Sequence, residues 1–232
     1  MALSRRDFVK LCSGTVAGFG VSQMFHPAIH EAFAQTLTGE RPPVFWVQGQ
    51  GCTGCSVTLL NSTHPSIADV LLKIISLEFH PTVMAAEGEG AYEHMMRVAE
   101  KFKGKFIFAV EGAVPVAHDG KCCVVAEADH HEVTMTEVTK VLAANAAAVL
   151  AVGTCAAYGG IPAGKGNETG AMGVSAFLKK EGIPAPVINI PGCPPHPDWI
   201  VGTIGLGLQA LATNTLGLLV KQGLDANGRP KA

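Results

Sequence analysis

Charged and aromatic side chains are scarce in this chain, and their scarcity excludes several classes of protein. Of the 232 residues, 16% are charged and 6% are aromatic, and the formal net charge is −2 with no run of basic residues. A nucleic-acid groove needs clustered lysine and arginine, so we expect no nucleic-acid partner. The sequence also lacks an HExxH motif and a Ser-His-Asp order. Its 48% hydrophobic residues can bury the core of one domain.

The first 34 residues are predicted to be a twin-arginine signal peptide and not part of the fold. Arg5 and Arg6 precede a weakly apolar run, 11–25, which is too short to span a bilayer. A small-x-small cleavage site then ends at Ala34. We therefore expect export to the periplasm by the twin-arginine pathway, with any membrane association made through partners, and a mature domain over 35–232.

Strand and helix patterns alternate through the mature chain. Continuous apolar runs, such as 106–110 and 147–152, are typical of strands buried on both faces. The patterns predict strands at 44–48, 78–84, 106–110, 147–152 and 186–190, with an extra strand at 121–127. They predict helices at 56–61, 66–77, 89–102, 134–145 and 174–181, the first two separated by a pause at His64-Pro65. This alternation predicts an α/β fold with a doubly wound parallel sheet.

The uncharged stretch from Trp199 to Val220 is long enough to raise the question of a membrane span. Its glycines, threonines, glutamine and asparagine make it poorly apolar for its length, so it would insert weakly. We interpret it as a final helix that covers the sheet.

A glycine-rich turn follows the first predicted strand and allows two readings. Gly49-x-Gly51-x-x-Gly54 matches a dinucleotide-binding fingerprint, and Glu78 could be its acidic residue for the ribose. However, thiols occupy the part of the turn where a pyrophosphate needs bare backbone N–H groups. A nicotinamide-binding oxidoreductase therefore stays as an alternative.

Four cysteines follow the ends of three predicted strands. Cys52 and Cys55 come after the first strand, Cys155 after the strand at 147–152, and Cys193 after the last. Because ligands of a parallel sheet bind beyond its carboxyl edge, these thiols should converge on one metal or iron–sulfur site. One Cys-x-x-Cys pair with two scattered singles favours a [4Fe-4S] cluster over zinc, which usually takes two such pairs. A zinc-stabilised binding module and a redox dithiol at Cys52 and Cys55 remain the alternatives.

Further polar residues are less informative. Glu111 ends a buried strand on the same edge, where it could tune a cluster or move protons, or be a solvated strand end. The adjacent Cys122 and Cys123 should face opposite ways on a strand, so we interpret them as structural thiols. The histidines at 130, 131 and 196 are expected on the surface or in loops.

Together these motifs resemble those of the small subunit of periplasmic nickel–iron hydrogenases, including the selenium-containing branch. The resemblance covers essentially the whole mature chain, and its motifs are Cys52-Thr-Gly-Cys55, Glu111-Gly-Ala, Gly153-Thr-Cys155-Ala-Ala-Tyr-Gly-Gly-Ile-Pro162 and Pro191-Gly-Cys193-Pro-Pro-His-Pro197.

This resemblance implies a flavodoxin-like domain that holds the proximal [4Fe-4S] cluster on the four cysteines, with Glu111 nearby. It implies no catalytic residue in this chain, because the nickel–iron site that splits hydrogen belongs to a large subunit. Electrons would pass to an acceptor such as a c-type cytochrome or another cluster protein. Family members continue into a region with medial and distal clusters, whereas this sequence ends at Ala232, so we expect that region to be absent from this chain.

Overall fold

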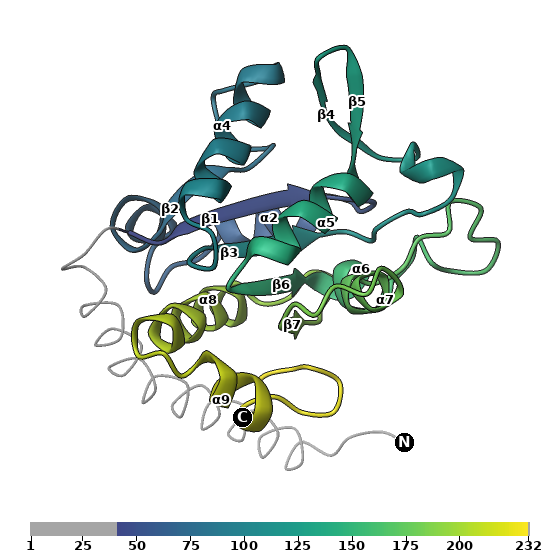
Figure 1. Ribbon diagram of the computed structural model, residues 1–232. Helices are drawn as coiled ribbons and strands as arrows, with labels where there is room; N and C mark the ends of the chain where they lie inside the picture. The colour runs from purple at the N-terminus through teal and green to yellow at the C-terminus, as the bar shows by residue number, and fades with distance from the viewer. Residues whose placement is uncertain (1–40, 232) are drawn as a thin grey trace, which may run out of the picture.

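The centre of the molecule is a five-stranded parallel sheet in the order β2-β1-β3-β6-β7 (Figure 1). The computed structural model describes residues 41–231, so the predicted signal peptide lies outside the described residues. The strands are β1 (Pro43–Gln48), β2 (Ser76–Phe79), β3 (Ile107–Glu111), β6 (Ala148–Val152) and β7 (Val187–Ile190). This strand order is that of flavodoxin-like doubly wound sheets, which confirms the predicted α/β class.

Helices cover both faces of the sheet because its central strands are apolar on both sides. On one face, Phe45 and Phe108 pack with helices α4, α5 and α7. On the other, Trp46 and Ile107 pack with α2 and α8. Figure 1 shows α4 and α5 above the sheet and α8 below it. The bounds of these helices are α2 Gly54–Leu60, α4 Gly88–Lys101, α5 Met135–Asn145, α7 Val174–Lys180 and α8 Pro197–Ala212.

The helix predicted at 56–61 corresponds to α2, and the predicted pause follows it, but the helix predicted at 66–77 is shorter and irregular. After α2 come the short helix α3 (Ile67–Asp69) and the π-helical turn η1 (Val70–Ile74), and Ile75 is already extended. The second strand therefore starts earlier and is shorter than the predicted 78–84. Pro81 follows closely after β2 and lacks the N–H group that a strand in a ladder would donate.

The predicted extra strand at 121–127 belongs to a separate hairpin. β4 (Val124–Ala128) pairs antiparallel with β5 (His131–Thr134), and the hairpin projects away from the main sheet after the 3₁₀ turn η2 (His118–Gly120) (Figure 1). Asp129 and His130 both have positive φ, as a two-residue hairpin turn requires. The expectation that the two adjacent cysteines lie on a strand is therefore wrong, whereas His131 begins β5 and is exposed at the surface, as expected.

The uncharged stretch near the carboxyl end forms two helices in place of the single one predicted. α8 packs Ile200, Ile204 and Leu208 against the sheet, and α9 (Leu216–Gln222) follows a break at 213–215. Asn214 has φ of 55° there, which a continuous helix would not allow. Among residues 41–231, no helix is long and apolar enough to cross a membrane.

Candidate functional site

The structure brings the four predicted cysteines together at the carboxyl edge of the sheet. Cys52 lies in the turn after β1, Cys55 in the first turn of α2, and Cys193 after β7. Cys155 lies in a short helix, α6 (Gly153–Tyr158), and not in the loop that was expected. All four line one small pocket. Three segments that are distant in the sequence therefore meet at one pocket, as the alternation of strands and helices predicts.

Glycines make room for the cysteine sulfurs. A Cβ atom at Gly153 would collide with the Cys55 sulfur, and one at Gly160 would lie 2.8 Å from the Cys155 sulfur. Both glycines have positive φ, 86° and 53°, which side chains other than glycine adopt at a cost. These two backbone positions form a cradle in which the sulfurs occupy the space of missing side chains.

The donor set of this pocket is four thiols. Thiolates around one zinc ion all lie about 2.3 Å from it, whereas in a cubane cluster each thiolate binds a different iron. Sulfur ligands of this kind suit both groups.

Two of the four thiols are disfavoured as thiolates by the protein around them. Burial raises the pKa of Cys55 to about 12, and the Glu111 carboxylate and the other three cysteines add to the rise. The pKa of Cys155 is also raised, mainly by burial. Metal ligation requires thiolates, so the charge of any metal held here would have to offset this cost.

Glu111 is buried at the end of β3 and receives several hydrogen bonds. Its carboxylate accepts the backbone N–H groups of Cys55, at 2.9 Å, and Ser56, at 3.2 Å. The indole N–H of Trp46 donates to it at 3.1 Å, and the Ser56 hydroxyl also donates to it. With 3% of its surface exposed, Glu111 is not a solvated strand end. It is held directly against the Cys55 turn.

Two buried residues beside Glu111 were not among those predicted from the sequence. Ser56 is completely buried in α2, and His80, 2% exposed, directly follows β2. The Nε2 atom of His80 lies 3.3 Å from the Ser56 hydroxyl, and its ring stacks on Trp46 at a centroid distance of 5.3 Å. His80 directly follows β2 at the carboxyl edge, but the strand predicted at 78–84 extended past it, so His80 could not be recognised as a strand-end residue.

The other residues singled out from the sequence lie apart from this pocket. The Cys122 and Cys123 sulfurs approach the backbone carbonyls of Ala117 and Gln48 and not the other cysteines. His131 faces Glu137 on the hairpin side, and the ring of the histidine at 196 accepts a backbone N–H at the start of α8. None of these residues lines the cysteine pocket.

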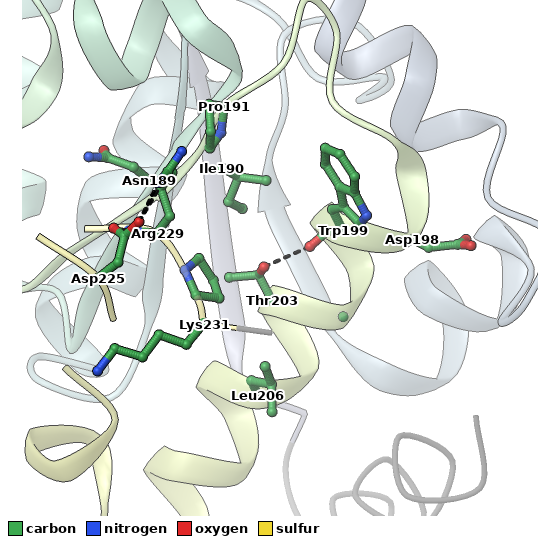
Figure 2. Close-up of a pocket in the computed structure, with 12 residues that line it drawn as sticks. Asn189, Ile190, Pro191, Asp198, Trp199, Thr203, Leu206, Asp225, Arg229 and Lys231 are labelled. Atoms are coloured by element: carbon green, nitrogen blue, oxygen red, sulfur yellow. Dashed lines mark hydrogen bonds and ion pairs between the residues drawn. The ribbon is translucent and has the colours of Figure 1, made fainter. Parts of the chain in front are cut away.

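A larger groove lies beside α8 and the carboxyl-terminal segment (Figure 2). Its volume is about 710 Å³, and Trp199 on its rim is 61% exposed. Figure 2 shows the ion pair between Asp225 and Arg229 on the opposite side, with an N···O distance of 2.6 Å. No cysteine lines this groove.

Comparison with known proteins agrees with this fold. Residues 52–206 match the family described as NADH ubiquinone oxidoreductase, 20 Kd subunit, which places the chain in a class of oxidoreductase subunits. The chain is 54% identical to the periplasmic [NiFeSe] hydrogenase small subunit of Desulfomicrobium baculatum, over 99% of this chain and 73% of that protein. It is 38% identical to the hydrogenase-2 small chain of Escherichia coli K12, over 87% of this chain and 51% of that one.

Comparison with solved structures also shows similarity to a nickel–iron–selenium hydrogenase. A chain of the [NiFeSe] hydrogenase from Desulfovibrio vulgaris Hildenborough superposes with a TM-score of 0.81 and 69% identity, over 84% of this chain and 70% of that one. The chain therefore belongs to the family of nickel–iron hydrogenase small subunits. This membership confirms the resemblance found in the sequence and makes the chain a subunit of an oxidoreductase.

Proposed function

We propose that this chain transfers electrons as the small subunit of a nickel–iron hydrogenase and binds one [4Fe-4S] cluster. Cys52, Cys55, Cys155 and Cys193 would be its four ligands. The main support is that these four thiols, from three strand ends, line one pocket at the carboxyl edge. A bound cluster supplies single-electron transfer, and its surroundings set its potential.

The chain's own residues would hold and shield this group. The cradle at Gly153 and Gly160 leaves space for the sulfurs, and the sheet edge fixes the segments that carry them. Glu111 orders the Cys55 turn by accepting two of its backbone N–H groups. The site residues, the domain over 35–232 and the twin-arginine leader to Ala34 are parts of the same proposal, as is location in the periplasm.

A large subunit carrying the nickel–iron site would dock where the cluster is nearest to the surface. Cys52 and Cys193 are exposed, and they border an open hollow of about 620 Å³ together with the loop at 161–169. Ile161 in this loop is 84% exposed, more than any other large apolar side chain of the described residues, and a docked subunit would cover it. Electrons would leave towards an acceptor such as a c-type cytochrome or another cluster protein.

The nicotinamide alternative conflicts with the contacts of the glycine-rich turn. A pyrophosphate would need the free N–H groups at the start of α2, but Glu111 already accepts those of Cys55 and Ser56. Glu78, the expected ribose ligand, pairs with His94 at 2.8 Å. Tight NADH binding by the purified chain would favour this alternative, and one zinc ion in a colourless protein would favour a structural module.

The decisive experiment measures iron and acid-labile sulfide in the anaerobically purified full chain, with an EPR spectrum after reduction. We expect about four of each per chain and the signal of a reduced cubane. Cys155→Ser should lose the cluster, whereas the matched control Cys122→Ser should keep it. Normal iron content in Cys155→Ser would contradict the assignment of the ligands.

A further inference from the structure

The buried residues behind Cys55 form a hydrogen-bond chain with a direction. The backbone N–H of Thr82 donates to Nδ1 of His80 at 3.2 Å, so the ring proton must reside on Nε2. Nε2 can then donate to the Ser56 hydroxyl, 3.3 Å away. The Ser56 hydroxyl donates in turn to Glu111. This series of hydrogen bonds therefore runs from an exposed turn, through His80 and Ser56, to the Glu111 carboxylate beside the proposed cluster.

Neighbouring side chains support the same donor-to-acceptor direction of these hydrogen bonds. The Gln48 amide donates to the Ser56 hydroxyl at 2.9 Å, so Ser56 accepts two hydrogen bonds and has one proton left, which goes to Glu111. Burial lowers the pKa of His80, against the opposing charge of Glu111, and this favours the neutral ring that the geometry requires. Trp46 fixes the arrangement from β1, because it stacks on His80 and donates to Glu111.

We propose that Ser56 and His80 are positioning residues that hold the Glu111 carboxylate against the Cys55 turn, and that the charge held there lowers the cluster's reduction potential. This inference rests on the cluster proposed above. A fixed negative charge beside a buried cluster disfavours an added electron. Ser56 and His80 are both uncharged in this arrangement, so they can influence the potential mainly through the place in which they hold Glu111.

The test is a set of reduction potentials, measured by EPR-monitored titration with dithionite. It uses the full chain, purified anaerobically with its cluster and any partner that accompanies it. Glu111→Gln removes the charge and should favour the reduced cluster roughly tenfold, which is about 59 mV for a one-electron couple. Ser56→Ala should shift the potential in the same direction, by roughly threefold to tenfold in the equilibrium constant.

A double-mutant cycle separates positioning from a direct effect. In the Glu111→Gln background, Ser56→Ala should produce no further shift, because the charge that it positions has gone. The matched control is Thr203→Val, which removes a hydroxyl that is 6% exposed and donates to a backbone carbonyl in α8. It should leave the potential unchanged. Iron content and the EPR line shape show for each variant that the cluster is present.

Two results would overturn the inference. One is an unchanged potential in Ser56→Ala with full iron content, and the other is a shift of equal size with and without Glu111. If Ser56→Ala does not bind iron, His80→Phe takes its place: it keeps a ring against Trp46, removes the donor to Ser56, and lies outside the Cys55 turn. The same two results then decide. A parent protein without iron would instead refute the proposed function, and this inference with it.

Discussion

Replacing Gly153 by alanine tests whether the cradle around the cysteine sulfurs is needed for the cluster. Gly153 has φ of 86°, and an added Cβ would collide with the Cys55 sulfur. The backbone conformation alone should cost about 1–2 kcal/mol, and overpacking of a close contact adds about 1–3 kcal/mol. The expected loss of folding free energy is therefore about 2–5 kcal/mol, and the Cys55 sulfur must move.

The matched control is Gly104→Ala. Gly104 has a similar φ of 74°, but nothing lies within 4 Å of its added Cβ. It should therefore lose only the conformational part, about 1–2 kcal/mol, and keep its iron. Urea unfolding and iron analysis of both variants measure the two effects. Full iron content in Gly153→Ala, with a stability equal to that of Gly104→Ala, would refute the cradle.

Two further predictions concern the folding stability of the chain, one of them measured without iron. The pKa of the Cys55 thiol is raised from 9.0 to about 12 in the folded chain. As the pH rises from 9.0 towards 12, the unfolded chain therefore loses this proton before the folded chain does. The free energy of unfolding should fall over this pH range. Urea unfolding of the iron-free chain measures this slope, which Cys55→Ser should flatten; an unchanged slope would contradict the assignment. Separately, Thr134 and Glu137 form a capping box at the start of α5, and Thr134→Ala should cost about 1 kcal/mol without changing iron content. Loss of iron in that variant would show that α5 is coupled to the site.

Much of the fold and the set of candidate ligands could be predicted from the sequence. Runs such as 106–110 are apolar throughout because their strands are buried on both faces. Once strands and helices alternate, every strand must end at the same edge. That topological rule, and not any local motif, is why Cys155 and Cys193 could be assigned to one pocket with Cys52 and Cys55.

Secondary structure at less regular positions could not be predicted. β4 and β5 have residues typical of strands, but no local sequence feature indicates that they pair with each other and not with the main sheet. The break between α8 and α9 depends on the positive φ of Asn214, within a stretch whose composition would also suit one helix. Helix α6 was missed because glycine and cysteine beside a strand end are equally typical of a loop.

The α/β class, the sheet edge at which the four cysteines meet and the family could therefore all be predicted from the sequence. What surrounds the cysteines became known only from the folded chain. Glu111 contacts Trp46, 65 positions away in the sequence, and Ser56, 55 positions away. His80 contacts Ser56, which is 24 positions away. Hydrophobic periodicity reports which face of an element is buried. It does not encode which side chains from different elements meet, because that depends on strand register and helix placement over the whole chain.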